Sequence, residues 1–381
     1  MTNPAIRSDP EKLLRQVMAR FVDQEVTPRA REIDERGEFP QELFKKLASM
    51  NVFNVRYLGM KKGATGNATL YCIICEELAR GLVSLAAETA KQCLMGTNFL
   101  YRFGSPELKE KYLEPSMRGE MVGSFCLTEP EAGGDLGSVT TTAVDDGDHW
   151  IISGMKTWIT NAPIASYFTV LCQTQPGKGI RGLNFFFVPR DTPGVQVSPR
   201  FDTLGTRTTE ISEVAFNDCR IPKDYLVGLP GKGMGAFFAI LAEIRTMTAA
   251  LALGVARAAF DASFQYAQER KAFGKTISKY QLIQAKISDM ATDIWAAELM
   301  IYDTTRKLDQ GQRVDKESMM AKYFATEVAC RCVDQATRIL GAYAYSMEYP
   351  VQRFFRDARF LLYGGGTHEV LRQNIARAMR F

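Results

Sequence analysis

The 381-residue sequence predicts an α+β protein with an N-terminal helical domain, a middle β-barrel or sandwich domain and a C-terminal four-helix bundle. Two observations support this order. The chain is 46% hydrophobic and 24% charged, the balance of a globular protein with a sizeable core. Apolar residues recur at helical spacing in the first and last parts, whereas short β-branched or aromatic runs fill the middle. We place the domains at residues 1–120, 121–232 and 233–381.

The first domain is predicted to be a series of helices. In LLRQVMARFVDQEVTPRAREID, apolar residues stand three and four apart, and Pro28 should kink or end that helix. The next strongly helical run, LYCIICEELA, contains a CxxC pair at Cys72 and Cys75. No second cysteine pair has a ligand-like spacing, and the chain has only 2 histidines. We therefore interpret the pair as core thiols and expect no metal site.

The middle domain consists of strand-like runs separated by the turn signals DDGD, PGKG and DTPG. These runs are VGSFCLT, VTTTAV, HWIISG, KTWIT, YFTVLC, LNFFFVP and VQVS. Helices return after GLPGKGMG, and four stretches have the length and apolar content of an up-down bundle. They are residues 237–268, 281–308, 316–340 and 367–380.

The composition argues against two classes of partner. Lys and Arg number 47 against 43 Asp and Glu, and a net charge of +4 without a dense basic run does not indicate nucleic-acid binding. No window approaches ~18 uninterrupted apolar residues, so we expect no membrane span. The polar beginning MTNPAIRSDPEK resembles neither a signal nor a transit peptide, and we expect a cytoplasmic protein.

Arg245 is the first candidate functional residue. In AFFAILAEIRTMTAALALGVA the only charges are Glu243 and Arg245. A buried arginine is costly unless it is paired, so Arg245 needs an anionic or carbonyl partner, either within the protein or on a ligand. Gly364, Gly365 and Gly366 precede Thr367, a good helix cap. They form either a plain turn or a place where a ligand approaches the backbone closely.

Five segments, in this order and spacing, resemble the acyl-CoA dehydrogenase family of flavoproteins. They are FCLTEPEAGGD, MKTWITN, RKAFGKTISKYQLIQAKISDMA, RILGAY and YGGGTHEVLRQNIAR. The resemblance covers essentially the whole chain and agrees with the helix–strand–helix order predicted above.

This resemblance implies that FAD is held in an extended form between the β-domain and the C-terminal bundle. Six residues should lie at the flavin: Phe125, Leu127, Thr128, Trp158, Ile159 and Thr160. Arg270, Phe273 and Gln281 should reach the adenosine diphosphate portion across a subunit interface, which implies a homo-oligomer, either a dimer or a homotetramer. Five further residues match family contacts to FAD: Arg338, Gly341, Ala342, Thr367 and Glu369. Arg338 replaces the usual glutamine, and Gly134 replaces a serine that often touches the acyl-CoA.

The family reaction implies a glutamate that removes the α-proton of the acyl group while the flavin accepts the β-hydride. The position of that glutamate is Gly365 in this sequence, so the backbone N–H that polarises the thioester carbonyl is retained and the carboxylate is not. A second branch of the family carries the base immediately before Arg245, where this sequence has Ile244. Both usual positions of the base therefore lack a carboxylate.

The remaining candidates for proton transfer are Glu243, Glu88, Tyr363 and His368. Lys91 lies one helical turn after Glu88, at a position that should face the acyl group together with Gly364 and Tyr363. Glu88 and Lys91 form either a surface ion pair or a functional pair in which Lys91 recognises an anionic substituent. For His368 we favour packing at the helix cap.

These features predict a FAD-dependent oxidoreductase that acts on an acyl-CoA with unusual regiochemistry and exchanges electrons with an electron-transferring flavoprotein. An alicyclic acyl group such as cyclohexene-carboxyl-CoA, or the reduction of an enoyl-CoA, would fit the missing base. The alternative is a non-redox lyase that resembles the sulfinopropionyl-CoA desulfinases and keeps FAD as a scaffold. A third possibility is a flavoprotein that binds acyl-CoA without turnover.

Overall fold

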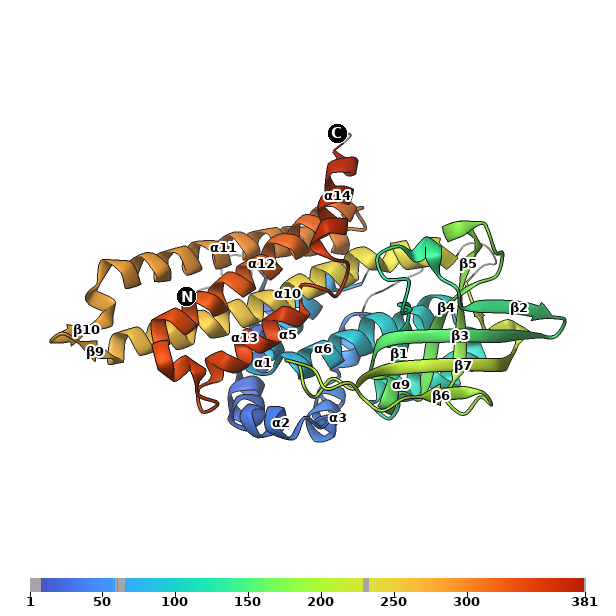
Figure 1. The fold of residues 1–381 in the computed structure, drawn as a ribbon, viewed down its shortest axis with the longest axis horizontal. Coiled ribbons are helices and arrows are strands. Elements are labelled where there is room, and N and C mark those ends of the chain that lie inside the picture. Colours follow the sequence, from blue (N-terminus) through green and yellow to red (C-terminus); the bar gives the residue numbers. More distant parts are fainter. Residues whose placement is uncertain (1–7, 59, 61–65, 229–232, 380–381) are drawn as a thin grey trace.

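The computed structural model describes residues 8–58, 60, 66–228 and 233–379, and it has the predicted order of helices, strands and helices (Figure 1). Helices fill the N-terminal part, a twisted sheet forms one end of the molecule, and long helices run away from that sheet to the other end. The first seven residues and the predicted boundary at residue 232 lie outside the described residues.

The N-terminal part contains nine of the α-helices that the structure describes. They are α1 (Asp9–Phe21), α2 (Ala30–Arg36), α3 (Gln41–Ser49), α4 (Val52–Val55), α5 (Ala68–Gly81), α6 (Val83–Lys91), α7 (Asn98–Phe103), α8 (Pro106–Leu108) and α9 (Glu114–Met117). The predicted interruption at Pro28 is confirmed, because Pro28 lies in a short 3-10 turn between α1 and α2. Cys72 and Cys75 are buried thiols in α5, as predicted.

The middle part is one main sheet. Its strands are β1 (Gly123–Cys126), β2 (Thr142–Asp146), β3 (His149–Thr160), β4 (Tyr167–Gln173), β5 (Leu183–Pro189), β6 (Val195–Val197), β7 (Ile211–Pro222) and β8 (Leu226–Val227). The strand order is β6-β7-β3-β2-β4-β5-β8, and β1 pairs with β4 in parallel. Two sequence predictions are corrected here. HWIISG and KTWIT form the single strand β3, bent at Gly154, and β7 was not predicted.

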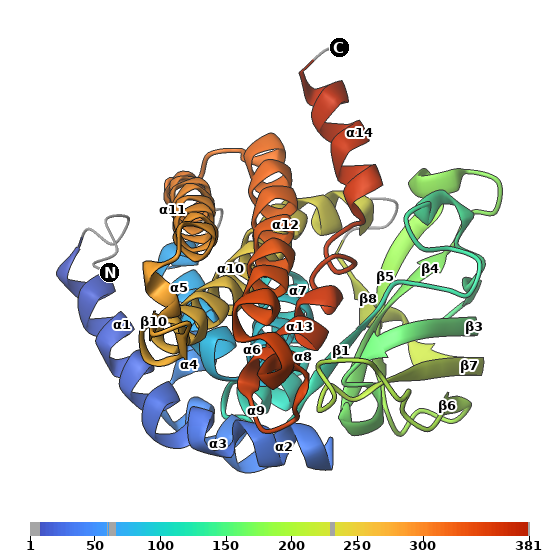
Figure 2. The same ribbon diagram turned by 60° about the vertical axis from the view of Figure 1, so that its left-hand side comes forward.

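The C-terminal part begins with α10 (Gly233–Glu269) and continues through a small hairpin, β9 (Lys271–Ala272) and β10 (Lys275–Thr276). Then follow α11 (Gln281–Asp309), α12 (Asp315–Leu340), α13 (Pro350–Phe360) and α14 (His368–Ala378). A C-terminal helical domain is confirmed, but the predicted fourth helix, α14, projects away from the others (Figures 1 and 2). Instead α13, absent from the prediction, packs against α10 and α12.

Helix α10 forms the centre of the helical part. It packs against α5, α11 and α12, so its residues are apolar on most sides. By length and composition α10 could cross a membrane, but 75% of its most apolar window is buried inside the protein. These properties are typical of the core helix of a folded domain.

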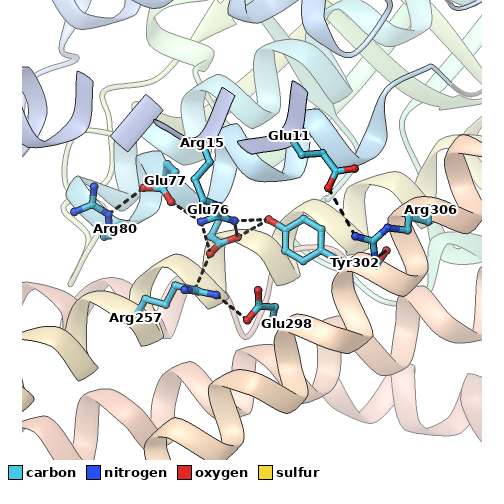
Figure 3. Close-up of polar contacts among 9 residues, drawn as sticks. All are labelled: Glu11, Arg15, Glu76, Glu77, Arg80, Arg257, Glu298, Tyr302 and Arg306. Atoms are coloured by element: carbon cyan, nitrogen blue, oxygen red, sulfur yellow. Dashed lines mark hydrogen bonds and ion pairs between the residues drawn. The ribbon is translucent and has the colours of Figure 1, made fainter. Parts of the chain in front are cut away.

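A buried ion-pair network fastens the N-terminal helices to the bundle (Figure 3). Glu76 of α5 lies 2.7 Å from both Arg15 of α1 and Arg257 of α10, and Arg257 also lies 2.9 Å from Glu298 of α11. Burial alone would raise the pKa of Glu76, but the two guanidinium groups lower it to about 2. This carboxylate therefore stays charged, and the network is a structural joint between four helices.

Candidate functional site

The three glycines lie in a turn that joins α13 to α14. Gly365 has φ +74° and Gly366 has φ +106°, values that glycine adopts without the penalty a side chain brings. In the described part of the chain, no acceptor bonds to the N–H of Gly364 or Gly365 in ordinary hydrogen-bond geometry. Successive free N–H groups in such a turn form a site for a carbonyl oxygen or an anion.

Arg245 of α10 lies directly beside this turn. Its side chain is only 9% exposed, and its Nε donates to the carbonyl oxygen of Gly365 at 3.3 Å. Among the described residues, no carboxylate lies within ion-pair distance of it, and burial lowers its pKa to about 10. Of the two partners predicted from the sequence, the structure therefore provides the carbonyl and not an anion.

Lys322 of α12 reaches the same turn and was missed by the sequence interpretation. The residue is fully buried, and its Nζ donates to the carbonyl oxygens of Leu362 at 3.0 Å and Gly366 at 2.9 Å. Burial and the nearby charge of Arg245 lower its pKa to about 8. A signal did exist in the sequence, since Lys322 shares a helix face with the buried residues Met319 and Ala325.

Lys91 lies where the three parts of the molecule meet. Its Nζ is 2.8 Å from Thr160 Oγ1, at the end of β3, and 5.7 Å from the ring centre of Phe360, at the end of α13. Burial lowers the pKa of the amine to about 8. Because Phe360 leads directly into the glycine turn, Lys91 belongs to the same region as Arg245.

Glu88 does not form the surface ion pair with Lys91 that was one of the sequence interpretations. It is fully buried, and its Oε1 accepts a hydrogen bond from Thr208 at 3.3 Å. Its other oxygen has no hydrogen-bond partner among the described residues, and burial raises its pKa well above the usual range. The spacing was compatible with an ion pair, but each side chain bonds instead to a threonine of the middle part, Glu88 to Thr208 and Lys91 to Thr160.

Glu243, one of the candidates for proton transfer, is the counter-ion of two arginines in the structure. Its carboxylate lies 2.6 Å from Arg56, which is fully buried, and 2.8 Å from Arg102. Two further residues singled out in the sequence have structural roles: Ile244, at the position of the base in the second branch of the family, and His368, a candidate for proton transfer. Ile244 packs in the apolar core, and His368 bonds to Thr326 and to Glu327 at 2.8 Å each, which is packing at the cap.

Replacing Glu243 with glutamine is expected to destabilise the fold by about 3–5 kcal/mol, because the buried ion pairs of this carboxylate with Arg56 and Arg102 would be lost. The measurement is the free energy of unfolding in denaturant. Glu35→Gln, which removes an exposed ion pair with Arg31, is the control and should change stability far less. Unchanged stability with lost turnover would return Glu243 to the candidates for the base.

Three family models match this chain in sequence order. They describe the acyl-CoA dehydrogenase N-terminal domain at residues 8–120, the middle domain at 124–219 and the C-terminal domain at 231–380. The chain belongs to the acyl-CoA dehydrogenase family. It is therefore an acyl-CoA oxidoreductase, as the resemblance of its motifs implied.

Individual relatives of this acyl-CoA dehydrogenase span its whole length. Benzylmalonyl-CoA dehydrogenase of Aromatoleum aromaticum is 42% identical, covering 97% of this chain and 98% of the relative. The 3-(aryl)acrylate reductase of Clostridium sporogenes is 38% identical over the same shares of the two chains. The structure of butyryl-CoA dehydrogenase from Megasphaera elsdenii superposes with a TM-score of 0.93 at 31% identity, covering 98% of this chain and 99% of that one.

Three of the six residues predicted to face the flavin, Trp158, Ile159 and Thr160, lie at the end of β3 in this acyl-CoA dehydrogenase. Trp158 is 62% exposed and has φ +58°, an uncommon conformation for a tryptophan. The next buried residue after β3, Asn161, has no hydrogen-bond partner for either polar side-chain atom among the described residues. An exposed aromatic ring beside unpartnered polar atoms fits a planar, polar cofactor. The side chain of Ile159 packs in the β-domain core.

The other flavin-side predictions have mixed positions. Phe125 stacks on Phe185 with ring centres 5.3 Å apart, below the surface of the site. Leu127 and Thr128 are half-buried, and their backbone carbonyls accept hydrogen bonds from Lys156 and Thr157. Gly134 is exposed, and a Cβ there would lie 3.2 Å from Val370 of α14. Tyr363 is exposed at the start of the glycine turn.

A second group of predicted cofactor residues lies away from the flavin-side group. Arg270 and Phe273 lie on the hairpin, at the end of the bundle opposite the β-domain (Figure 1). Gln281, Gly341, Ala342 and Arg338 are close to that end, and Arg338 pairs with Asp334. Thr367 and Glu369 instead begin α14. The hairpin residues therefore lie far from the flavin-side residues of the same chain, and their contact with the cofactor of another chain stays a prediction from the resemblance.

Proposed function

We propose that this protein is a FAD-dependent oxidoreductase acting on an acyl-CoA whose α-carbon carries a carboxylate. One observation carries the proposal: the family position of the proton acceptor is Gly365, and the buried cation beside it, Arg245, has a backbone carbonyl and no carboxylate as its partner among the described residues. A site without a base needs another source of electrons at the α-carbon. A site with an uncompensated cation favours an anion on the substrate.

An α-carboxylate satisfies both conditions. When CO2 leaves, the electron pair of the broken bond between the α-carbon and the carboxylate forms the new α,β double bond, and no base is required. Bound FAD would supply the two-electron acceptor for the β-hydride, so the acyl group would be oxidised by two electrons and the cofactor reduced by two. The N–H groups of Gly364 and Gly365 would hold the thioester oxygen, which takes up negative charge in the transition state.

The names of two relatives support this substrate class. A benzylmalonyl-CoA is a thioester with a carboxylate on its α-carbon, and an aryl acrylate has the same three-carbon, aryl-substituted acyl skeleton. We therefore propose an aryl-substituted acyl group in preference to an alicyclic one. The reduction of an enoyl-CoA remains compatible with the reductase relative.

FAD binding rests on the family and on the fit of the residues present. Trp158 and Thr160 would contact the ring, and the unpartnered amide of Asn161 lies next to them. Arg270 would supply positive charge to the pyrophosphate of FAD in a second copy of the chain. We also propose an electron-transferring flavoprotein as the electron partner.

A homo-oligomer would complete the cofactor site. Large apolar side chains are exposed near the hairpin, among them Phe273 at 97%, Tyr345 at 95% and Leu282 at 80%. Exposed apolar residues gathered at one end of the bundle favour contact with a second copy.

Replacing Arg270 with alanine is expected to lower the FAD content of the purified protein and to weaken the oligomer. The reason is that one guanidinium would serve both the pyrophosphate and the interface. The measurements are the FAD-to-protein ratio and the mass in solution by light scattering. Arg313→Ala, at an exposed pair with Asp315, is the control. Full FAD retention and an unchanged mass would contradict the assignment of Arg270.

The proposed function is tested by anaerobic titration of the holoenzyme with a benzylmalonyl-CoA, 3-phenylpropanoyl-CoA, a cyclohexene-carboxyl-CoA and octanoyl-CoA. We expect rapid flavin bleaching and stoichiometric CO2 only with the first. Turnover without bleaching would favour the non-redox lyase of the desulfinase type. Binding without bleaching or turnover would favour a non-catalytic flavoprotein.

A further inference from the structure

We propose that Lys322 is a positioning residue that shapes the glycine turn so that its free N–H groups receive the thioester carbonyl. The proposal rests on the proposed function only in taking an acyl-CoA thioester as the ligand. It does not depend on an α-carboxylate or on the reaction that follows.

The hydrogen bonds of Lys322 define the turn from both ends. One ammonium group donates to the carbonyl oxygens of Leu362 and Gly366, at 3.0 Å and 2.9 Å. Gly364 and Gly365 lie between these two anchors, and Arg245 holds the carbonyl of Gly365 at 3.3 Å. The carbonyl oxygens of residues 362, 365 and 366 therefore accept hydrogen bonds from Lys322 or Arg245. The N–H groups of Gly364 and Gly365 have no hydrogen-bond acceptor among the described residues.

Three consecutive glycines require such anchoring. Glycine loses more conformational freedom on ordering than any other residue, so an unanchored run would sample many shapes. Donors that stabilise a developing oxyanion act well only when they are already in place. A single group that binds two carbonyls four residues apart restricts the segment between them.

The position of Lys322 is hard to explain by stability alone. The lysine is fully buried, and within residues 8–58, 60, 66–228 and 233–379 no carboxylate lies within ion-pair distance of it. The nearby charged groups are Arg245, Glu327 and Glu369, and Glu327 bonds to His368. An apolar residue would fill the same space without the cost of burying an ammonium group. Among the described residues, the hydrogen bonds of its ammonium group go to the two carbonyls of the turn.

The test compares a thioester with a thioether that lacks the carbonyl. The probes are 3-phenylpropanoyl-CoA and S-(3-phenylpropyl)-CoA, and the readout is the dissociation constant of each for the oxidised holoenzyme. In Lys322→Met we expect thioester affinity to fall about tenfold or more, while thioether affinity changes by less than about twofold. Lys322→Arg, which keeps the charge, should recover part of the difference.

Lys286→Met is the matched control, because Lys286 also donates a hydrogen bond, to Gln335 at 2.7 Å, but on the outer side of α11 and α12. It should leave the ratio of the two dissociation constants unchanged. If the ratio of the two dissociation constants in Lys322→Met equals the wild-type ratio, the proposal is overturned, whether both affinities fall equally or neither falls. If Lys322→Met does not fold, the same comparison in Lys322→Arg and Lys322→Gln decides. Failure of the wild type to bind either probe would instead contradict the proposed function.

Discussion

Replacing Gly365 with glutamate is expected to create dehydrogenase activity on saturated straight-chain acyl-CoAs, which the natural protein should oxidise very slowly. General-base catalysis is worth roughly 10²–10⁴-fold in rate, and the wild type lacks a carboxylate at this position. A Cβ at Gly365 would lie 3.6 Å from Thr248 Oγ1 and 3.7 Å from Arg245 Cγ, which are ordinary contacts. The new side chain therefore has room next to a cation that can keep it ionised.

Only partial recovery is expected, because φ at Gly365 is +74° and a side chain there is strained by about 1–3 kcal/mol. The measurement is kcat/KM for octanoyl-CoA and for a benzylmalonyl-CoA. We expect the first to rise and the second to fall, since the new carboxylate would repel an α-carboxylate and occupy Arg245. Gly365→Gln carries the same strain without the base and should gain nothing. Rapid oxidation of octanoyl-CoA to the trans-2-enoyl product by the wild type would show that the base lies elsewhere.

Replacing Arg245 with leucine is expected to lower kcat/KM for the α-carboxylated substrate on the order of 10²–10³-fold, the scale of losing one charged group from a desolvated site. The melting temperature should change little, because the substitution also removes the cost of burying a cation that has no carboxylate partner in the described structure.

The matched comparison is Arg245→Lys, which keeps the charge but loses the planar donor geometry and should retain part of the activity. The loss should be smaller for 3-phenylpropanoyl-CoA binding, since that ligand has no α-carboxylate. A large fall in melting temperature with intact kinetics would assign Arg245 a structural role, namely holding the Gly365 carbonyl.

Most of the fold could be predicted because its signals are local. Helical spacing of apolar residues marked α10, α11 and α12, and β-branched runs marked most strands of the sheet. Strand β7 and helix α13 were missed. Strand β7 mixes buried and exposed positions with charged residues, and α13 carries three arginines and an aspartate, of which Arg353 and Asp357 are buried. The packing position of α14 was also not predicted, because its sequence pattern indicates a helix but not the surface against which that helix packs.

The sequence by itself determined the family, the absence of a carboxylate at Gly365 and Ile244, and the need of Arg245 for a partner. These are properties of residue identity and order. Only the tertiary structure decided which charges meet. Glu243 pairs with Arg56 and Arg102 from distant parts of the chain, and Lys322 donates to two carbonyls of the turn. Glu88 and Lys91 bond to different threonines of the middle part. Backbone carbonyls are the same at every residue, so no sequence pattern identifies one as an acceptor until folding brings a buried donor to it.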